Sequence, residues 1–352
     1  MFTTTPDICS VPERPETGIC ALGSAAGEPS HSGEYLSDCS PRDRPWDLHR
    51  SQADCVTEIY LSANHSRWFT RLGERMAQCA QVLVFGWELE KHSAGALTLK
   101  LRRAYFCRVR HCPVCQWRRS KMWIARFLQA SPHLLIHYPR ARFLYLTLTQ
   151  KNVSIAELAT TLQQMSKAWG RLTKRKEFAP VLGWIRAVEV TRGKDGTAHP
   201  HYHILLMVPG NYFRRSGSFV TQPVWTSIWR DSLRLDYDPI VHVETVKARS
   251  ATRNPSMASA ALMDAARETL KYSVTPMDMV ADPDWLLELT RQLHKRRFIA
   301  SGGVLRGVLR EKNETNDDLL VLGEGSSDKT GSLHFDWSRP VRRYRRRSQF
   351  RQ

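Results

Sequence analysis

Three histidines alternate with single residues at the start of a strongly apolar run. His199, His201 and His203 are followed directly by the apolar residues 204–208. Side chains of a β-strand point alternately to opposite faces, so the three imidazoles are expected to share one face. Neutral imidazole is the commonest metal ligand among protein side chains. The segment therefore predicts a strand that is buried on one face and carries a metal site on the other.

The residues before this strand predict a β-hairpin. A second alternating segment, residues 184–191, is followed by the turn-forming sequence Gly-Lys-Asp-Gly at residues 193–196. If the connection has an odd number of residues, Glu189 lies opposite His201 and its carboxylate meets the imidazoles. Glu189 and His199 are the two candidates for a third ligand. A mixed site of this kind favours Mg²⁺ or Mn²⁺ over a closed Zn²⁺ site.

Four cysteines form a second candidate metal site. Cys112 and Cys115 have the two-residue spacing of a zinc knuckle, and Cys107 lies five residues upstream. Cys79 could complete the tetrahedron, and His111 is the alternative fourth ligand. The pattern predicts a structural Zn²⁺ site at the start of a basic helix.

The chain is strongly basic, which favours a polyanionic partner. Its 352 residues include 52 Lys and Arg against 34 Asp and Glu, a formal net charge of +18. Such an excess is the electrostatic footprint of nucleic-acid binding. Arginines and aromatic residues are interleaved around the cysteines: Arg102, Arg103, Tyr105, Phe106, Arg108, Arg110, Trp117, Arg118 and Arg119. This combination allows phosphate contact together with base stacking.

Composition divides the chain into four parts. Residues 1–60 are rich in Ser, Pro, Gly and acidic residues and predict a disordered segment. A Cys-rich, DNA-contacting region is expected over 61–130, an α+β domain over 131–310, and a flexible, acidic and then basic tail over 311–352. Alternating and helical periodicities predict these elements: helices over 68–84, 224–233, 257–272 and 285–296, and strands over 142–149, 184–191, 199–208 and 240–246.

Several classes of protein are disfavoured. No stretch approaches the ~20 apolar residues of a membrane span. The first residues lack the basic start and apolar run of a secretory signal, so a cytoplasmic protein with reduced or metal-bound cysteines is expected. A phosphate-binding loop of an ATP-driven motor is also missing from the sequence.

Glu268 and Tyr272 suggest covalent chemistry. They lie four residues apart on a predicted helix and therefore share one face. A tyrosine hydroxyl is a poor nucleophile unless it is activated, and a metal that polarises a phosphate can make it competent. Without the histidine strand, this pair would be typical of an ordinary helix surface.

These motifs together resemble those of rolling-circle plasmid replication initiators of the HUH endonuclease superfamily. Three blocks carry the resemblance: Phe-Leu-Tyr-Leu-Thr-Leu-Thr at residues 143–149, Glu189-Val190-Thr191 leading to residues 199–206, and Glu-Thr-Leu-Lys-Tyr at residues 268–272. The residues around the cysteines, including Gln-Trp-Arg-Arg-Ser at 116–120, and residues 297–309 are also similar. The likeness covers about residues 65–310.

The resemblance implies a fold and a set of roles. It implies an α+β fold with the HUH endonuclease core, a four- to five-stranded antiparallel sheet with packed helices, plus the small zinc-binding segment. His201 and His203 would hold the catalytic Mg²⁺ or Mn²⁺, with Glu189 completing the site. Tyr272 would be the nucleophile, and Glu268 a general base for the water that ends the reaction.

The expected function is that of a site- and strand-specific DNA endonuclease and strand transferase. It would start rolling-circle plasmid replication by nicking the origin through a 5′-phosphotyrosine intermediate. The expected partners are single-stranded or supercoiled origin DNA and a host helicase and DNA polymerase. A transposase or relaxase with the same site, and a non-catalytic zinc-dependent DNA-binding regulator, are the alternatives.

Overall fold

The computed structural model describes residues 34–63, 65–89, 97–214, 219–246, 255–271, 274–309, 314–320 and 331–347. Its α-helices are α1 (Leu36–Cys39), α2 (Pro45–Ser62), α3 (Arg67–Ala77), α4 (Pro113–His137), α5 (Leu158–Leu172), α6 (Gln222–Leu233), α7 (Pro255–Thr269), α8 (Pro276–Val280), α9 (Pro283–Gln292) and α10 (Asn316–Leu320). Its strands are β1 (Val82–Leu89), β2 (Leu97–Ala104), β3 (Arg142–Thr149), β4 (Gly183–Arg192), β5 (Ala198–Val208), β6 (Val241–Thr245), β7 (Ile299–Gly303), β8 (Ser332–Ser338) and β9 (Arg343–Arg346).

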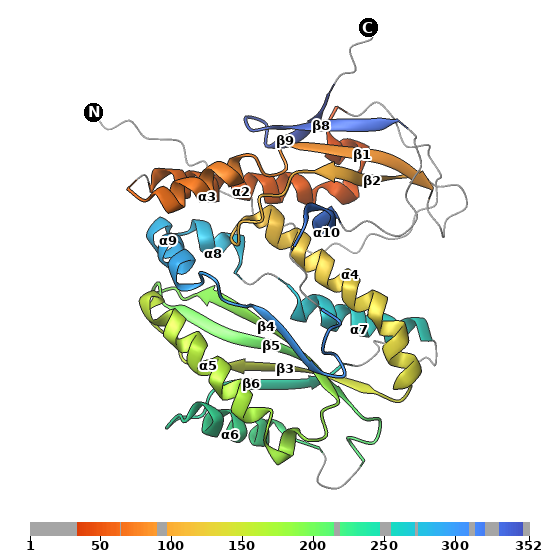
Figure 1. The fold of residues 1–352 in the computed structure, drawn as a ribbon, viewed down its shortest axis with the longest axis vertical. Coiled ribbons are helices and arrows are strands. Elements are labelled where there is room, and N and C mark those ends of the chain that lie inside the picture. The colour runs from red at the N-terminus through yellow and green to blue at the C-terminus, as the bar shows by residue number, and fades with distance from the viewer. Residues whose placement is uncertain are drawn as a thin grey trace. The chain divides into compact units, whose positions relative to one another are not determined.

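The described residues divide into two compact units (Figure 1). The first unit is drawn from residues 1–115 and 316–352, and the second from residues 116–315. Each unit contains one antiparallel sheet with helices packed on it. The α+β class and the antiparallel sheet of four to five strands, which were predicted from the sequence, are therefore confirmed.

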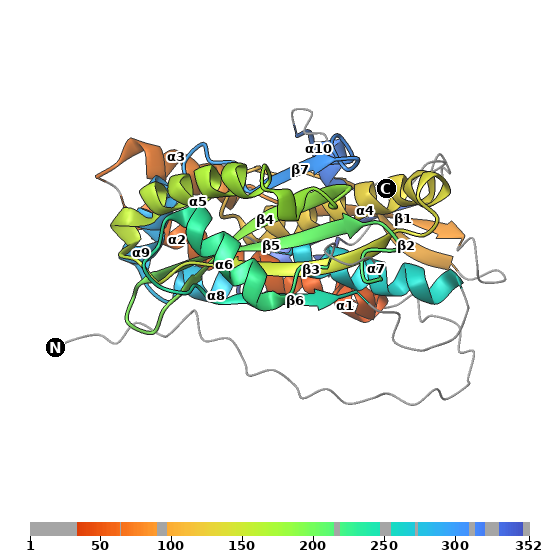
Figure 2. The same cartoon turned by 90° about the horizontal axis from the view of Figure 1, so that it is seen from below.

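The sheet of the second unit has β5 at its centre. Its strand order is β6-β3-β5-β4-β7, and all neighbours are antiparallel (Figure 2). On one face of β5, Tyr202 is buried against Trp229 of α6, with the ring centroids 6.1 Å apart. The opposite face, which carries His201 and His203, is covered by α7. Helices on both faces explain why the strand is buried along almost its whole length.

The sheet of the first unit has the order β2-β1-β8-β9 and is also antiparallel. Helices α2 and α3 pack against each other, and α2 also packs against β9. The core is aromatic and fully buried: Trp46, Tyr60, Phe69, Phe85, Phe106, Phe335 and Tyr344. Buried aromatic rings of this size supply most of the apolar area that can stabilise a unit with such short strands.

The prediction that residues 1–60 are disordered is wrong for residues 34–60. They form α1, a short 3₁₀ helix and most of α2. Trp46, Ala53, Val56 and Tyr60 lie on one face of α2 and are buried. The polar composition of the whole segment concealed this spacing, which is that of an amphipathic helix.

The helix predicted over residues 68–84 is shorter than expected. Helix α3 ends at Ala77, and residues from Val82 onward form β1. Between them Ala80 adopts a left-handed conformation with φ of 52°, and its N–H donates to the carbonyl of Tyr105 at 2.7 Å. This reversal of the chain cannot be seen in periodicity, because apolar residues continue through it.

The tail predicted to be flexible over residues 311–352 contains ordered structure. Residues 332–338 and 343–346 form β8 and β9, which pair with each other, and β8 pairs with β1. Arginines of this segment form ion pairs with acidic residues of the first unit: Arg339 with Glu58, Arg343 with Asp38, Arg345 with Glu34, and Arg347 with Asp336. The basic run therefore forms part of a sheet, and its charges have local partners.

Candidate metal centre

The hairpin of β4 and β5 brings the first predicted ligands together. Five residues, 193–197, connect the strands, and Gly196 in this turn has a φ of 80°, which favours glycine. The odd length sets the register so that Glu189 lies directly opposite His201. The hairpin predicted from the sequence is confirmed, and the register is the one expected for a connection with an odd number of residues.

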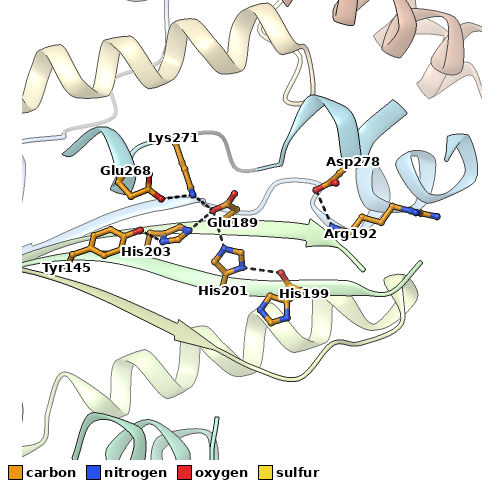
Figure 3. A network of polar contacts seen from close by, with 9 residues as sticks. All are labelled: Tyr145, Glu189, Arg192, His199, His201, His203, Glu268, Lys271 and Asp278. Atoms are coloured by element: carbon orange, nitrogen blue, oxygen red, sulfur yellow. Dashed lines mark hydrogen bonds and ion pairs between the residues drawn. The ribbon is translucent and has the colours of Figure 1, made fainter. Parts of the chain in front are cut away.

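Glu189, His201 and His203 point their polar atoms at one another (Figure 3). The Oε2 atom of Glu189 lies 3.1 Å from Nε2 of His201 and 2.5 Å from Nε2 of His203. All three side chains are buried, and their ligand atoms lie within 4.8 Å of one another. Two imidazoles and a carboxylate that converge in this way could hold a divalent cation.

The other ring nitrogens of the two histidines face protein atoms. Nδ1 of His203 contacts the hydroxyl of Tyr145 on β3, and Nδ1 of His201 lies 3.3 Å from the carbonyl oxygen of His199. An Nδ1–H held by an oxygen leaves the Nε2 lone pair available for a metal. The surroundings of both rings therefore fit the binding of a cation through Nε2.

His199, the alternative third ligand, is not among the convergent ligand atoms, although its ring centroid lies 5.3 Å from that of His201. Its Nδ1 atom is 2.6 Å from Oδ1 of Asn152, which stands next to the turn of the hairpin. Within the described ranges, the only groups that could hold a metal are Glu189 with the two histidines and the cysteine cluster. The structure thus favours Glu189 over His199 as the third member.

Residues just after α7 reach this group. Helix α7 ends at Thr269, so it is shorter than the helix predicted over 257–272, and Lys271 lies beyond its end. Nζ of Lys271 lies 3.1 Å from Oε2 of Glu189 and 2.7 Å from Oε1 of Glu268. The hydroxyl of Ser120 on α4 donates to the carbonyl of Leu270 at 2.6 Å, which anchors this end of the helix. The predicted nucleophile, Tyr272, is the next residue after Lys271 and lies outside the described residues.

The four predicted zinc ligands also converge. The Sγ atoms of Cys79 and Cys107 each lie 3.6 Å from Sγ of Cys115, and Sγ of Cys112 lies 3.6 Å from that of Cys79. All four side chains are buried. Cys79 follows α3, Cys107 follows β2, and the other two flank the start of α4. The cluster thus includes Cys79, and His111 does not belong to it.

The pKa values of the cysteines in this cluster differ in direction: burial and the neighbouring thiols raise those of Cys79 and Cys107 well above the usual value. Burial opposes ionisation of Cys112, but hydrogen bonds from Cys107, Cys115 and Cys79 lower the pKa of its thiol well below the usual value. The backbone N–H of Val109 donates to Sγ of Cys107 at 3.4 Å, and that of Cys107 donates to Sγ of Cys79 at 3.5 Å. Four convergent sulfur atoms, two of which accept backbone N–H bonds, are typical of a structural zinc site.

Comparison with known proteins gives the family of the chain. A family described as "Replication protein" matches residues 98–345, which are most of the chain. The matched residues include all the candidate metal ligands except Cys79. The chain belongs to this family. The match confirms the resemblance to plasmid replication initiators that the three sequence blocks indicated.

Individual relatives of this replication protein agree with the family. "Protein rep" of Lactiplantibacillus plantarum is 35% identical over 257 residues, which are 70% of this chain and 77% of that protein. "Protein rep" of Bacillus amyloliquefaciens is 30% identical over 332 residues, or 86% and 94% of the two chains. "Protein rep" of Streptococcus pneumoniae is 31% identical over 294 residues, or 82% and 86%. No solved structure matches the chain.

Charges in the Glu189 group of this replication protein complement one another. Burial opposes ionisation of Glu189, but hydrogen bonds from His201 and His203 hold the pKa of its carboxyl well below the usual range. Burial lowers the pKa of His203, which favours its neutral form. Burial also lowers the pKa of Lys271, but the hydrogen bond to Glu268 and the charge of Glu189 raise it more. The group therefore combines an ionised carboxylate, a neutral imidazole at His203 and a nearby ammonium.

Two residues of this group were missed in the sequence analysis, Tyr145 and Lys271. Tyr145 belongs to the strand that was predicted over 142–149, on the face that carries Thr147. Thr147 lies directly opposite His203. Tyr145, two residues before Thr147 on the same strand, therefore shares a face with the histidine. Alternation gives the faces of a strand but does not say which strand lies beside it, so the sequence held no signal for this contact.

The predicted DNA-contacting residues near the cysteines have different environments. Phe106 is fully buried and stacks on Trp46 at 6.4 Å between ring centroids, so it belongs to the core of the first unit. Arg119 forms a two-point ion pair with Glu314, at 2.6 and 2.9 Å. Tyr105 is 46% exposed. Base stacking by Phe106 is thereby excluded in this conformation, whereas Tyr105 has an exposed ring.

A helix that spans a membrane must be both long and apolar. Across the described ranges, none of the helices combines the necessary length with the necessary apolar character.

Proposed function

We propose that this replication protein initiates rolling-circle plasmid replication by nicking one strand of the origin. The nick would form through a covalent bond between Tyr272 and the 5′ phosphate. The observation that carries the proposal is the convergence of Glu189, His201 and His203 beside Lys271, the residue bonded to Tyr272. A metal site next to a tyrosine is the arrangement that nucleophilic cleavage of a phosphodiester requires.

The three ligands would hold Mg²⁺ or Mn²⁺. A buried mixture of carboxylate and imidazole suits these ions. Because both ions prefer oxygen ligands, a phosphate oxygen of the DNA could also bind to them. When bound, the ion would supply Lewis acidity, which withdraws charge from the scissile phosphate. The cysteine cluster would hold Zn²⁺ as a structural ion, since four thiolates leave no position open for a substrate.

Tyr272 would carry out the displacement at phosphorus. Its hydroxyl oxygen forms a bond to phosphorus as the bond to the 3′ oxygen breaks, and the proton of the hydroxyl leaves to solvent or a base. The departing oxygen takes up a proton and becomes the 3′ hydroxyl from which a polymerase extends. One phosphodiester replaces another, so the energy needed for rejoining is retained.

Lys271 and Glu268 would have different roles: Lys271 during this step, and Glu268 in the hydrolysis that follows it. The raised pKa of Lys271 keeps it an ammonium, so it supplies positive charge beside Glu189 and does not accept the tyrosine proton. Glu268 is half-exposed and accepts a hydrogen bond from Lys271. An exposed carboxylate at the C-terminal end of α7 is suitable as general base for a water molecule that hydrolyses the phosphotyrosine bond.

The alternatives have less support. The family and the relatives are replication proteins, which favours an origin over the ends of a transposon or a conjugative transfer site. A non-catalytic zinc-dependent regulator would leave the buried carboxylate and imidazoles without a role. Because the sequence contains no ATP-binding loop, unwinding and synthesis would come from a host helicase and DNA polymerase.

The test is to trap and map the covalent product. The full chain is incubated with a supercoiled plasmid that carries its origin, in Mn²⁺, and the mixture is boiled in detergent. We expect a protein–DNA adduct that a chelator prevents, and peptide mass spectrometry that finds the nucleotide on Tyr272. A metal-dependent nick with no adduct, or an adduct on another residue, would contradict the proposal.

Binding to origin DNA should depend steeply on salt. With a net charge of +18, the protein is expected to neutralise several phosphates and release their counterions. If about six to ten phosphates are contacted, affinity should fall by about 10³–10⁵-fold between 50 and 200 mM salt. Fluorescence anisotropy with a labelled origin duplex measures the slope, and a slope near zero would exclude this mode of binding.

A further inference from the structure

Tyr145 on β3 is buried beside the metal centre but is not one of its three ligands. Its side chain is 7% exposed, and its hydroxyl contacts Nδ1 of His203 (Figure 3). We propose that Tyr145 is a positioning residue, which fixes the tautomer and the orientation of His203 and thereby sets the affinity for the divalent cation. This inference rests on the proposed function of the Glu189, His201 and His203 group.

The sheet brings Tyr145 and His203 together in a fixed geometry. Thr147 pairs directly with His203 across β3 and β5, so Tyr145 lies on the same face, one pleat further along. The phenol and imidazole rings are nearly parallel, with an interplanar angle of 22° and 5.7 Å between centroids. Both side chains are buried in the sheet, so neither ring can turn without disturbing its neighbours.

The chemistry of imidazole makes this contact important for metal binding. A neutral imidazole has one protonated and one unprotonated nitrogen, and a metal requires the lone pair of the unprotonated one. A cation can bind to Nε2 only when the proton of His203 lies on Nδ1, where the oxygen of Tyr145 can accept its hydrogen bond. Loss of the phenol oxygen would remove the acceptor for Nδ1–H and so favour the tautomer with the proton on Nε2, which donates to Glu189 and cannot bind a metal.

The phenol itself stays neutral in this position. Burial raises the pKa of Tyr145, and the negative charges of Glu268 and Glu189 raise it further. Tyr145 is therefore a hydrogen-bonding group and does not compete with Tyr272 as an anionic nucleophile.

Of the two histidines, only His203 depends on a side chain in this way. Nδ1 of His201 lies 3.3 Å from the backbone carbonyl of His199, which substitutions do not remove. A change of Tyr145 to Phe therefore alters one ligand and leaves the other intact. Groups that orient metal-binding histidines typically contribute about 10–100-fold to metal affinity.

The experiment compares Tyr145→Phe with Tyr202→Phe in the full chain. Tyr202 is 1% exposed and lies on β5 on the opposite face, so its variant loses a buried hydroxyl without touching the metal centre. Mn²⁺ binding is measured by electron paramagnetic resonance. We expect about 10–100-fold weaker binding in Tyr145→Phe and unchanged binding in Tyr202→Phe.

Two further readouts separate positioning from general damage. Nitrogen chemical shifts of ¹⁵N-labelled histidine report the tautomer, and in Tyr145→Phe we expect His203 to lose its preference for the Nδ1–H form. Nicking by the variant should need more Mn²⁺ for half-maximal rate, with the rate at saturating Mn²⁺ close to that of the wild type. A merely structural effect would lower the saturated rate and leave the tautomer unchanged.

The inference fails if Mn²⁺ affinity and tautomer in Tyr145→Phe equal those of the wild type while Glu189→Ala weakens binding. If Glu189→Ala and the wild type bind Mn²⁺ equally, the proposed metal centre is itself wrong, and the role of Tyr145 is excluded with it. The two failures are therefore distinguished by one additional variant.

Discussion

Tyr272→Phe is expected to abolish covalent attachment to origin DNA and to reduce nicking by about 10³-fold or more. The substitution removes one oxygen atom, and that atom is the proposed nucleophile, so no slower version of the same reaction remains. Nicking is measured as the conversion of supercoiled origin plasmid to the open circular form in Mn²⁺. Binding to the same DNA should be retained, because phosphate and base contacts do not depend on this hydroxyl.

The matched control is Tyr237→Phe. Tyr237 lies in the same unit, where its hydroxyl accepts a hydrogen bond from the backbone N–H of Lys151 at 3.2 Å. This variant should nick at the rate of the wild type. Cleavage by Tyr272→Phe at a similar rate, with an adduct still formed, would identify another nucleophile and refute the assignment.

The second large effect is expected at the cysteine cluster. Cys112→Ser should release the zinc ion and unfold much of the first unit. Structural zinc sites in small folded peptides contribute about 10–16 kcal/mol of apparent binding free energy, which exceeds the free energy of unfolding of most domains. The measurements are zinc content by mass spectrometry and thermal unfolding followed by tryptophan fluorescence, to which Trp46 and Trp337 of this unit contribute.

A second buried cysteine of the same unit provides the comparison. Cys55 lies on α2, outside the cluster, so Cys55→Ser should retain one zinc ion per chain and lose only a small part of the stability. Purified wild type with no bound zinc, or a Cys112→Ser variant that keeps its zinc and its unfolding temperature, would refute the structural zinc site.

Contacts in the metal centre could be predicted from the sequence only where the two residues are close together along the chain. Glu189 and His201 are joined by a short turn, so alternation and loop length were enough to place them opposite each other. Tyr145 lies 58 residues before His203, and Lys271 lies well after it. Which strand pairs with β5, and which helix end lies over it, depends on the packing of the whole unit.

The same reason explains the errors in the first unit. Strand β1 pairs with β8, for example Val82 with Asp336, and nothing local in either segment indicates a partner so distant. The polar composition around α2 also outweighs the few apolar residues spaced along it, Trp46, Val56 and Tyr60. A polar segment with a few large apolar residues can fold when a remote part of the chain covers them.

The pairing of β1 with β8 also has a consequence for how the protein is made. Strands β1 and β2 leave the ribosome more than two hundred residues before β8 and β9 do. At about 5–20 residues per second, the nascent chain would expose an open sheet edge for about 10–50 s. The contiguous second unit can fold during this interval. An mRNA truncated before its last codons would thus yield a polypeptide that contains Glu189, His201 and His203 but lacks strands β8 and β9 of the first sheet.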